Sequence, residues 1–210
     1  MFHPLLRRQG LYAITDGPRI DPVASAQAAL EGGAVLLQYR DKTGEQRRRR
    51  HEAGTLAKVC ARFGVPLVVN DDVELALASG ADGVHLGEND ISIAQARAAL
   101  GGDAIIGVSC YDSLQRARAA AAEGADYLAF GAFFPSPTKP QARHATPELL
   151  HAARELGKPL VAIGGVTPDN GGSLIAAGAD FLAVVSAVFG AQDIRAAAQD
   201  FTILFQTHSQ

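Results

Sequence analysis

The sequence predicts an α/β fold, a (β/α)8 TIM barrel that forms a single domain over residues 1–210, with its core at about 11–205. Short apolar runs recur about every 24 residues, and a helix-length segment follows each one. The runs are nearly uniformly apolar, which is typical of parallel strands covered on both faces. A glycine-alanine motif recurs before every second run, and this periodicity favours a closed, repeated architecture.

The eight apolar runs give the predicted strands in order: 11–15, 34–39, 67–70, 83–86, 105–109, 127–131, 160–163 and 181–185. Helix starts carry local signals between them. Asp21, Thr146 and Thr167 each precede a proline, which places an N-cap residue before a proline at the first helical position. Ser92 and Gln95 have the spacing of a capping box.

The ends of alternate helices share a motif: Gly33-Ala34, Gly80-Ala81-Asp82, Gly124-Ala125-Asp126 and Gly178-Ala179-Asp180. Glycine adopts the left-handed conformation that often ends a helix, so each motif can lead directly into a buried strand. A fourfold repeat of double units favours the closed barrel. The alternative is an open doubly wound sheet, which would leave two strand edges unpaired.

Composition excludes several classes of function. Nineteen basic residues against 22 acidic ones give a net charge of −3, which predicts no nucleic-acid or membrane partner. The basic run 47–50 points around a helix, and we expect it to form an outer, solvated face. No apolar stretch is long enough to span a membrane, and the start of the chain does not resemble a signal peptide. Two isolated cysteines, Cys60 and Cys110, suit a reducing, cytoplasmic setting. The oligomeric state stays open, with a homo-oligomer as one alternative.

In a barrel of this kind, functional groups gather where the strands end at their carboxyl termini. Gln38, Arg40 and Lys42 follow the second strand at alternate positions, so one side of an extended segment presents all three. The loop after the sixth strand adds the cation Lys139. Hydroxyl groups at the same rim come from four residues: Ser109, Ser136, Thr138 and Ser186.

A second anion site is predicted on the other side of this rim. Gly164 and Gly165 follow the seventh strand, where glycine lets backbone N–H groups approach a ligand closely. Loops after the seventh and eighth strands are the usual phosphate site of such barrels. Because the cations lie elsewhere on the rim, the mouth has room for two phosphorylated groups.

Carboxylates complete the predicted site. Asp71 and Asp90 follow the third and fourth strands, which lie about 4.8 Å apart in a parallel sheet. Oxygen ligands beside phosphate-binding cations suit Mg2+. Asp72 is predicted to cap the next helix, and His85, at the mouth, is left without a definite role.

Several catalytic motifs are missing from the sequence, and this excludes some types of reaction. None of the four lysines lies within a strand facing the barrel interior, which argues against a Schiff-base aldolase. The sequence contains no Walker A loop and no Ser-His-Asp set at the spacing of a nucleophile elbow. The mechanism that is left is catalysis by positioning the substrates and by electrostatic stabilisation of a departing diphosphate.

The rim residues resemble those of the thiamine-phosphate synthase family. The matching motifs, in family order, are Gln38-Tyr39-Arg40-Asp41-Lys42, Asn70-Asp71, Ala81-Asp82-Gly83-Val84-His85-Leu86-Gly87 with Asp90, Gly107-Val108-Ser109, Ser136-Pro137-Thr138-Lys139, Ile163-Gly164-Gly165-Val166 and Val185-Ser186. The resemblance covers nearly the whole chain. It implies a barrel enzyme that joins a hydroxymethylpyrimidine diphosphate to a thiazole phosphate and releases diphosphate, a transfer of an alkyl group.

The resemblance also implies roles for individual residues. Asp71 and Asp90 would bind Mg2+. The pyrimidine diphosphate would contact Gln38, Arg40, Lys42, Asn70, Ser109 and Lys139, of which Arg40, Ser109 and Lys139 are the expected catalytic residues. Tyr39 and Asp41, inside the first motif, are also assigned to substrate binding. The thiazole phosphate would contact Ser136, Thr138, Gly165, Val185 and Ser186.

Three positions depart from the family pattern: Ser136 replaces a usual threonine, Glu88 a common glutamine, and Cys110 a frequent histidine or asparagine. None of them removes a predicted ligand. The main alternative function is that of the related thiazole tautomerase-like isomerases, which usually lack the full set of cations and carboxylates. A non-catalytic sensor of phosphorylated ligands is a second alternative. Epimerase-like barrels fit less well because they use two histidines and two aspartates at the strand ends.

Overall fold

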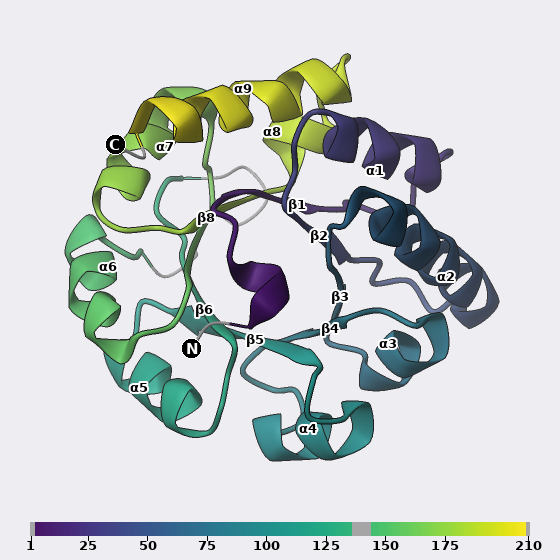
Figure 1. Ribbon diagram of the computed structural model, residues 1–210, viewed down its shortest axis with the longest axis horizontal. Helices are drawn as coiled ribbons and strands as arrows, with labels where there is room; N and C mark the ends of the chain where they lie inside the picture. Colours follow the sequence, from purple (N-terminus) through teal and green to yellow (C-terminus); the bar gives the residue numbers. More distant parts are fainter. Residues whose placement is uncertain (1–2, 136–143, 209–210) are drawn as a thin grey trace.

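Each strand pairs in parallel with the next one along the chain, and β8 pairs with β1, so that the sheet closes into a barrel (Figure 1). A computed structural model describes residues 3–135 and 144–208. The strands in order are β1 Gly10–Ile14, β2 Leu36–Tyr39, β3 Leu67–Asn70, β4 Gly83–Leu86, β5 Ile105–Tyr111, β6 Tyr127–Phe130, β7 Leu160–Ile163 and β8 Phe181–Val184. The predicted closed barrel is therefore confirmed, and the open sheet is excluded.

The predicted strand bounds differ from the structure by two residues at β2 and β5, and by one residue at each end of β1 and at the carboxyl end of β6 and β8. β2 begins at Leu36 rather than at residue 34, because the Ala34 N–H still bonds back to Ala29 O at the end of the preceding helix (3.1 Å). β5 continues to Tyr111, which pairs with Phe130 after a shift of register beyond Ser109. The shift lengthens this strand at the rim of the barrel, where the candidate site lies.

Helices surround the barrel (Figure 1), and the four that begin at Pro22, Ile93, Pro147 and Pro168 start where the sequence predicted. Asp21 accepts the N–H of Ala24 (2.9 Å), and Ser92 and Gln95 form the reciprocal capping box. Within the described residues the helices are α1 Pro22–Glu31, α2 Gln46–Phe63, α3 Val73–Ser79, α4 Ile93–Leu100, α5 Leu114–Ala122, α6 Pro147–Ala153, α7 Pro168–Ala176, α8 Ser186–Phe189 and α9 Ile194–His208, with short 3-10 helices η1 Pro4–Leu6 and η2 Arg154–Leu156.

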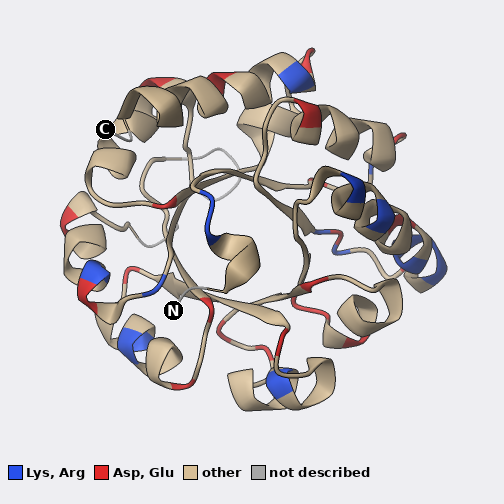
Figure 2. Ribbon diagram, viewed as in Figure 1, with Lys and Arg blue, Asp and Glu red and all other residues tan. Residues whose placement is uncertain are grey.

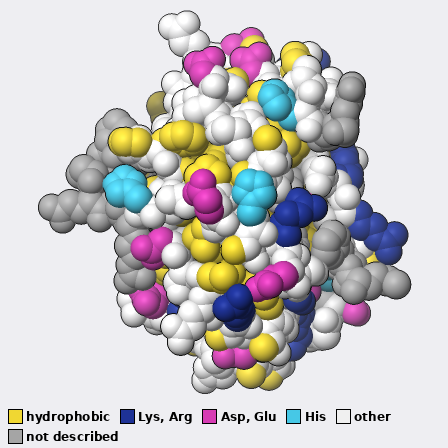
Figure 3. Space-filling model, turned by 90° about the vertical axis from the view of Figure 1, so that its left-hand side faces the viewer, with side chains coloured by type: hydrophobic (Ala, Val, Ile, Leu, Met, Phe, Trp, Pro, Cys, Tyr) yellow, Lys and Arg dark blue, Asp and Glu magenta, His cyan; other side chains and the backbone are white. Residues whose placement is uncertain are grey.

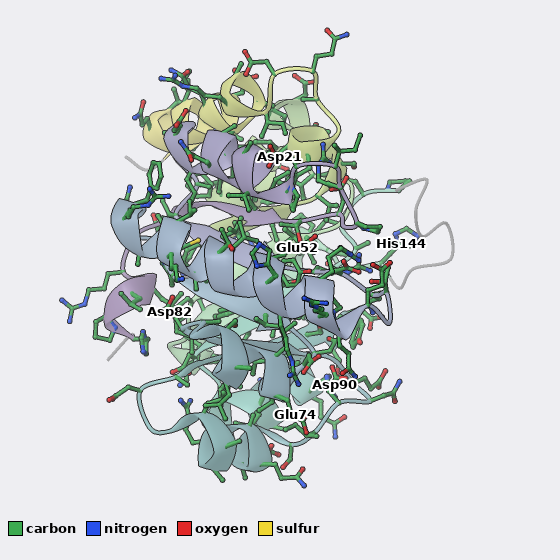
Figure 4. The ribbon with its side chains drawn as sticks, turned by 90° about the vertical axis from the view of Figure 1, so that its right-hand side faces the viewer. Asp21, Glu52, Glu74, Asp82, Asp90 and His144 are labelled. Atoms are coloured by element: carbon green, nitrogen blue, oxygen red, sulfur yellow. The ribbon has the colours of Figure 1, made fainter. Side chains whose placement is uncertain are left out.

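The apolar core consists of two layers. The larger layer lies between the strands and the surrounding helices. The smaller layer fills the barrel interior, where Leu6 of η1 packs with inward-facing side chains of the strands: Tyr12, Ile14, Val35, Leu36, Val68, Ile105, Tyr127, Ala129, Val161, Phe181 and Ala183. Figure 4 places η1 at the same end of the barrel as Asp82 and far from Asp90. The N-terminal segment therefore packs on the end of the barrel opposite the predicted site.

The aspartates of the repeated motif connect neighbouring strands at that end. Oδ2 of Asp82, Asp126 and Asp180 accepts the N–H of Leu67, Ile106 and Leu160 respectively, each at 2.8 Å. The N–H of each aspartate also donates to the carbonyl of the same partner residue. The motif therefore both ends a helix and fixes the register between β3 and β4, β5 and β6, and β7 and β8.

Charges are distributed unevenly over the outer surface. Arg residues are concentrated in the first half of α2 (Figure 2). On the face formed by α5, α6 and α7, acidic, basic and histidine side chains are interspersed with apolar ones (Figure 3). In the described part of the chain, no helix is both long enough and apolar enough to cross a membrane.

Replacing the aspartate at the start of β6 tests the role of the repeated motif. Asp126→Ala removes the acceptor for Ile106 N–H and the partner of Arg97 (2.8 Å), so we expect the free energy of unfolding to fall by about 1–3 kcal/mol. Urea denaturation measures this loss. The exposed Asp103, near the same end, provides the control variant Asp103→Ala, and equal losses in the two variants would contradict the assigned role.

Candidate active site

The rim at the carboxyl ends of the strands brings two carboxylates together. Asp71 follows β3 with a φ of 63°, an uncommon conformation for a residue other than glycine, and its N–H donates to His85 O (2.8 Å). Oδ2 of Asp90 accepts the N–H of Gly87 at 2.6 Å. The two carboxyl groups lie within hydrogen-bonding reach of each other. The structure thus confirms the predicted proximity of Asp71 and Asp90.

This proximity carries an electrostatic cost. Burial raises the pKa of Asp90, and the hydrogen bond and negative charge of Asp71 raise it further, while the Gly87 N–H and Lys42 act in the opposite direction. Lys42 Nζ lies 3.5 Å from Asp71 Oδ2, but its side chain is 62% exposed, so solvent weakens its compensation. A cation between the two carboxylates would relieve the repulsion that remains.

The donor set fits a magnesium ion. Within residues 3–135 and 144–208, no group of three or more His, Cys, Asp and Glu side chains could enclose a metal. Two carboxylates therefore leave most coordination positions to water and substrate oxygens, which is how Mg2+ is commonly bound in phosphate-handling sites. Asp71 and Asp90 are the residues that would hold it.

A chain of hydrogen bonds crosses the barrel interior beneath the rim. Gln38 Nε2 donates to Tyr12 Oη at 2.6 Å, and Tyr12 Oη lies 2.7 Å from Tyr127 Oη. Tyr127 Oη lies 2.9 Å from His85 Nδ1, and His85 Nε2 lies 2.8 Å from Ser109 Oγ. The chain therefore connects the predicted substrate-binding residues Gln38 and Ser109 through three buried side chains.

The middle of this chain is uncharged. Burial lowers the pKa of His85 to about 4, against a weaker opposing effect of Asp90, and burial raises the pKa of both Tyr12 and Tyr127. At neutral pH the imidazole therefore carries one N–H, and its other nitrogen accepts. Gly107 makes room for this arrangement, because a Cβ there would overlap the Tyr127 ring. His85, whose role the sequence left open, orients Ser109.

The predicted phosphate site lies on the opposite side of the barrel, beyond β7 and β8. Gly165 has a φ of +65°, and a Cβ there would approach Phe134 O to 2.7 Å, so only glycine fits. Its carbonyl accepts Asn170 Nδ2 at 3.0 Å. Val185 follows β8 and is half-buried, and Ser186 is exposed at the start of α8. Gly165, Val185 and Ser186 thus come from adjacent loops.

Of the remaining predicted site residues, two lie within the described part of the chain and three lie outside it. Arg40 is half-buried at the end of β2, and Asn70 ends β3 beside His85 of β4. Ser136, Thr138 and Lys139 lie outside the described residues.

The structure corrects the placement of Tyr39 and Asp41. Tyr39 is 2% exposed and packs in the layer beneath α2, where its hydroxyl donates to Glu52 Oε2 (2.7 Å). The Asp41 side chain is fully buried and pairs with Arg48. Successive side chains of an extended segment point to opposite sides, so the segment that presents Gln38, Arg40 and Lys42 turns these two away from the rim.

The expectation that all of residues 47–50 form a solvated face is also wrong in part. Arg47 and Arg50 are exposed, but Arg48 and Arg49 are half-buried. Arg48 pairs with Asp41, and Arg49 pairs with Asp72 at 3.0 Å. Asp72 caps α3 as predicted, since its Oδ1 accepts Leu75 N–H at 2.9 Å.

Arg116 of α5 supports the loops of the candidate site, a role that the sequence did not indicate. Its Nε donates to Ser109 O (2.6 Å) and its Nη2 donates to Gly87 O (3.1 Å). It thereby joins the ends of β5 and β4 next to Ser109 and Asp90. No local motif marks it, because its partners are backbone carbonyls, which any sequence supplies.

Neither cysteine takes part in the site. Cys110, one of the departures from the family pattern, is fully buried in the layer between strands and helices and points away from the interior. Burial raises the pKa of Cys60 and Cys110 to about 12, so both thiols are protonated at neutral pH. Cys110 therefore leaves the rim chemistry unaltered.

Fold and site together define a closed parallel β/α barrel whose rim carries a carboxylate pair flanked by Lys42. Comparisons with known proteins identify its relatives. The family model of thiamine monophosphate synthase matches residues 11–188. The thiamine-phosphate synthase of Methylobacillus flagellatus is 54% identical over 207 residues, 97% of this chain and 98% of that protein. That of Thiobacillus denitrificans is 53% identical over 201 residues, 93% of this chain and 94% of that protein.

Solved structures agree with the sequence relatives. The thiamine phosphate pyrophosphorylase from Pyrococcus furiosus matches with a TM-score of 0.90 and 36% identity, over 98% of this chain and 100% of that one. The chain belongs to the thiamine monophosphate synthase family. It is accordingly an enzyme of the transferase class, and the family resemblance seen in the sequence is confirmed.

The buried, neutral state of His85 predicts a pH dependence of stability. Its folded pKa of about 4 lies below the unfolded value of about 6.5, so the unfolded chain takes up the proton first as pH falls. Stability contributed by neutral His85 is complete above pH 6.5 and is lost between pH 6.5 and 4. From pH 7.5 to 5 we expect wild type to lose about 2 kcal/mol more than His85→Gln in urea denaturation. Parallel pH profiles for the two proteins would contradict this.

Proposed function

We propose that this protein joins a hydroxymethylpyrimidine diphosphate to a thiazole phosphate, forming thiamine phosphate and releasing diphosphate. One observation carries the proposal: a carboxylate pair flanked by Lys42 stands across the rim from the glycine turn at Gly164 and Gly165. The first arrangement suits a metal-bound diphosphate, and the second suits the phosphate of the other substrate. The family to which the chain belongs supports the same reaction.

The pyrimidine diphosphate would occupy the side of the rim formed by β2 to β5. Arg40 and Lys42 would contact its phosphate oxygens, and Lys139 would add a third cation. Asn70 and Gln38 would contact the substrate from the ends of β3 and β2. Ser109, held by His85 at 2.8 Å, would donate its hydroxyl toward the substrate. These contacts orient the bond between the methylene carbon and the leaving oxygen.

The thiazole phosphate would occupy the opposite side. Backbone N–H groups near Gly165 and the loop from Val185 to Ser186 would bind its phosphate, and hydroxyls of Ser136 and Thr138 would add hydrogen bonds. Anchoring the phosphate there leaves the thiazole ring free to reach across the rim. The ring nitrogen can then face the pyrimidine methylene carbon.

The proposed reaction is dissociative. The bond between the methylene carbon and the diphosphate oxygen breaks, and both electrons leave with diphosphate. The lone pair of the thiazole nitrogen then forms the new C–N bond, so no proton transfer is required. When bound, Mg2+ supplies positive charge that stabilises the leaving group. Arg40, Lys42 and Lys139 would stabilise the same developing charge.

The proposed reaction also indicates the binding partners of the protein and its cellular compartment. Small phosphorylated heterocycles would be the substrates, with no nucleic-acid or membrane partner. We infer a reducing, cytoplasmic setting, which the two free cysteines support. The direct test is to incubate the protein with both heterocycles and Mg2+ and to assay thiamine phosphate and diphosphate. Formation of both products in equal amounts is expected, and formation of neither would reject the proposal.

The carboxylate pair predicts how activity depends on magnesium. Asp71→Asn and Asp90→Asn each remove one charged ligand, so the Mg2+ concentration for half-maximal activity rises and kcat/KM at low Mg2+ falls. Titration of the activity with Mg2+ measures both effects. Full wild-type activity in excess chelator would show that the carboxylates serve another purpose.

Replacing Lys139 tests its proposed contact with the pyrimidine diphosphate. A charge-assisted contact contributes about 1.5–3 kcal/mol, so Lys139→Ala is expected to lower kcat/KM for the pyrimidine diphosphate by roughly 10- to 150-fold. Lys158→Ala, at the other end of the barrel before β7, is the matched control. Steady-state kinetics that do not distinguish the two variants would refute the assignment.

A further inference from the structure

The arginine run at the start of α2 requires a physical explanation. Four consecutive cations, Arg47 to Arg50, occupy the first turns of an 18-residue helix. The N-terminus of a helix carries partial positive charge, so cations there are unfavourable unless they have other partners. Arg48 and Arg49 each have an acidic partner, Asp41 and Asp72 respectively, in a loop of the candidate active site.

Arg48 binds the loop that follows β2. Its Nη2 lies 2.7 Å from Asp41 Oδ2 and also donates to Thr43 Oγ1 at 2.7 Å. Its other nitrogens contact Glu45 (3.0 Å) and Glu52 (3.0 Å) on the α2 side. One guanidinium group therefore joins the loop to the helix through four side chains.

The contacts of Arg48 define the path of this loop. Asp41 also accepts the N–H of Thr43 (2.8 Å), and this hydrogen bond closes a tight turn around Lys42. On the other side, Thr15 at the end of β1 accepts the Arg40 N–H at 2.8 Å and donates to Arg40 O at 3.2 Å. Arg40 and Lys42 are thus presented by a segment fixed from both β1 and α2.

Arg49 binds the next loop in the same way. Its Nη2 lies 3.0 Å from Asp72 Oδ2, and Asp72 is adjacent to Asp71. Asp71 has the left-handed φ of 63°, so its carboxylate direction depends on how its neighbours are held. Lys42 Nζ, 3.5 Å from Asp71 Oδ2, connects the two loops at the rim.

We propose that Arg48 and Arg49 are positioning residues that hold, through Asp41 and Asp72, the two loops presenting Arg40, Lys42 and Asp71 to the diphosphate. The inference rests on the proposed function, because it assigns these loops to the leaving group. Two adjacent residues of one rigid helix set the spacing between the cationic loop and the carboxylate loop. Arg47 and Arg50, exposed in the same run, have no such part.

Matched variants separate positioning from charge. Arg48→Gln, Arg49→Gln, Arg47→Gln and Arg50→Gln each remove one positive charge from the same turns of α2. The readouts are KM for each substrate, kcat, thermal unfolding, and the Kd of inorganic diphosphate with Mg2+ by isothermal titration calorimetry. For Arg48→Gln and Arg49→Gln we expect KM for the pyrimidine diphosphate and this Kd to rise roughly tenfold. KM for the thiazole phosphate is expected to stay within about twofold.

The controls define what would overturn the inference. Arg47→Gln and Arg50→Gln are expected to bind diphosphate within about twofold of wild type. Arg48→Lys keeps the charge but loses the planar fork, so it is expected to resemble Arg48→Gln rather than wild type. Wild-type diphosphate binding by Arg48→Gln and Arg49→Gln would refute positioning. Equal losses in all four glutamine variants would show that net charge, not loop geometry, governs binding.

Two further measurements keep the test decisive. If Arg48→Gln does not fold, Asp41→Asn breaks the same contact from the loop side, and the same tenfold loss is expected. An Asp41→Asn protein that binds diphosphate like wild type would overturn the inference. Failure of wild type to form thiamine phosphate would reject the proposed function, whereas an active wild type with unaffected Arg48 and Arg49 variants would reject only the positioning roles.

Discussion

Two carboxylates held close together at the end of a barrel are the constraint on which the rest of the site depends. β3 and β4 are neighbours, so their loops bring Asp71 and Asp90 into hydrogen-bonding reach. The arrangement includes a left-handed backbone at Asp71 and a raised pKa at Asp90, both of which are unfavourable in isolation. Such an arrangement is consistent with a cation-binding role, and the flanking Lys42 suits the anion that would accompany the cation.

The barrel separates charged from neutral polar groups by depth. The charged side chains of the candidate site lie at the rim, where solvent reaches them. Below them, the hydrogen-bonded chain that includes Tyr12, Tyr127 and His85 is neutral, because burial disfavours each charged form. A fully bonded neutral chain can be buried at little cost and still fix the directions of Gln38 and Ser109. The interior thereby orients rim residues without adding charge.

Sequence reasoning succeeded where the signal is local or periodic. The apolar runs gave the strands to within two residues, and glycine at Gly80 has the left-handed φ that a helix end requires. The same reasoning placed Asp71 and Asp90 together because strand order determines which loops are neighbours. It did not anticipate that the aspartate after such a glycine, as in Asp82, bonds the start of the preceding strand.

Contacts between distant residues could not be predicted from the sequence. Tyr12 and Tyr127 are 115 residues apart, and only the closed barrel brings their hydroxyls to 2.7 Å. Arg48 looks like its neighbours in the run, and its partner Asp41 is recognised only when the alternation of side chains along the loop is known. The alternation that presents Gln38, Arg40 and Lys42 at the rim turns the residues between them, Tyr39 and Asp41, toward Glu52 and Arg48 of α2.

The measurement that tests the central claim most directly is the position of a bound metal. Crystals grown with diphosphate and Mn2+ in place of Mg2+ would locate the ion by its anomalous scattering. The account predicts an anomalous peak between the carboxylates of Asp71 and Asp90, with diphosphate oxygens completing the coordination. A metal and diphosphate bound elsewhere, with both carboxylates free of ligands, would contradict it.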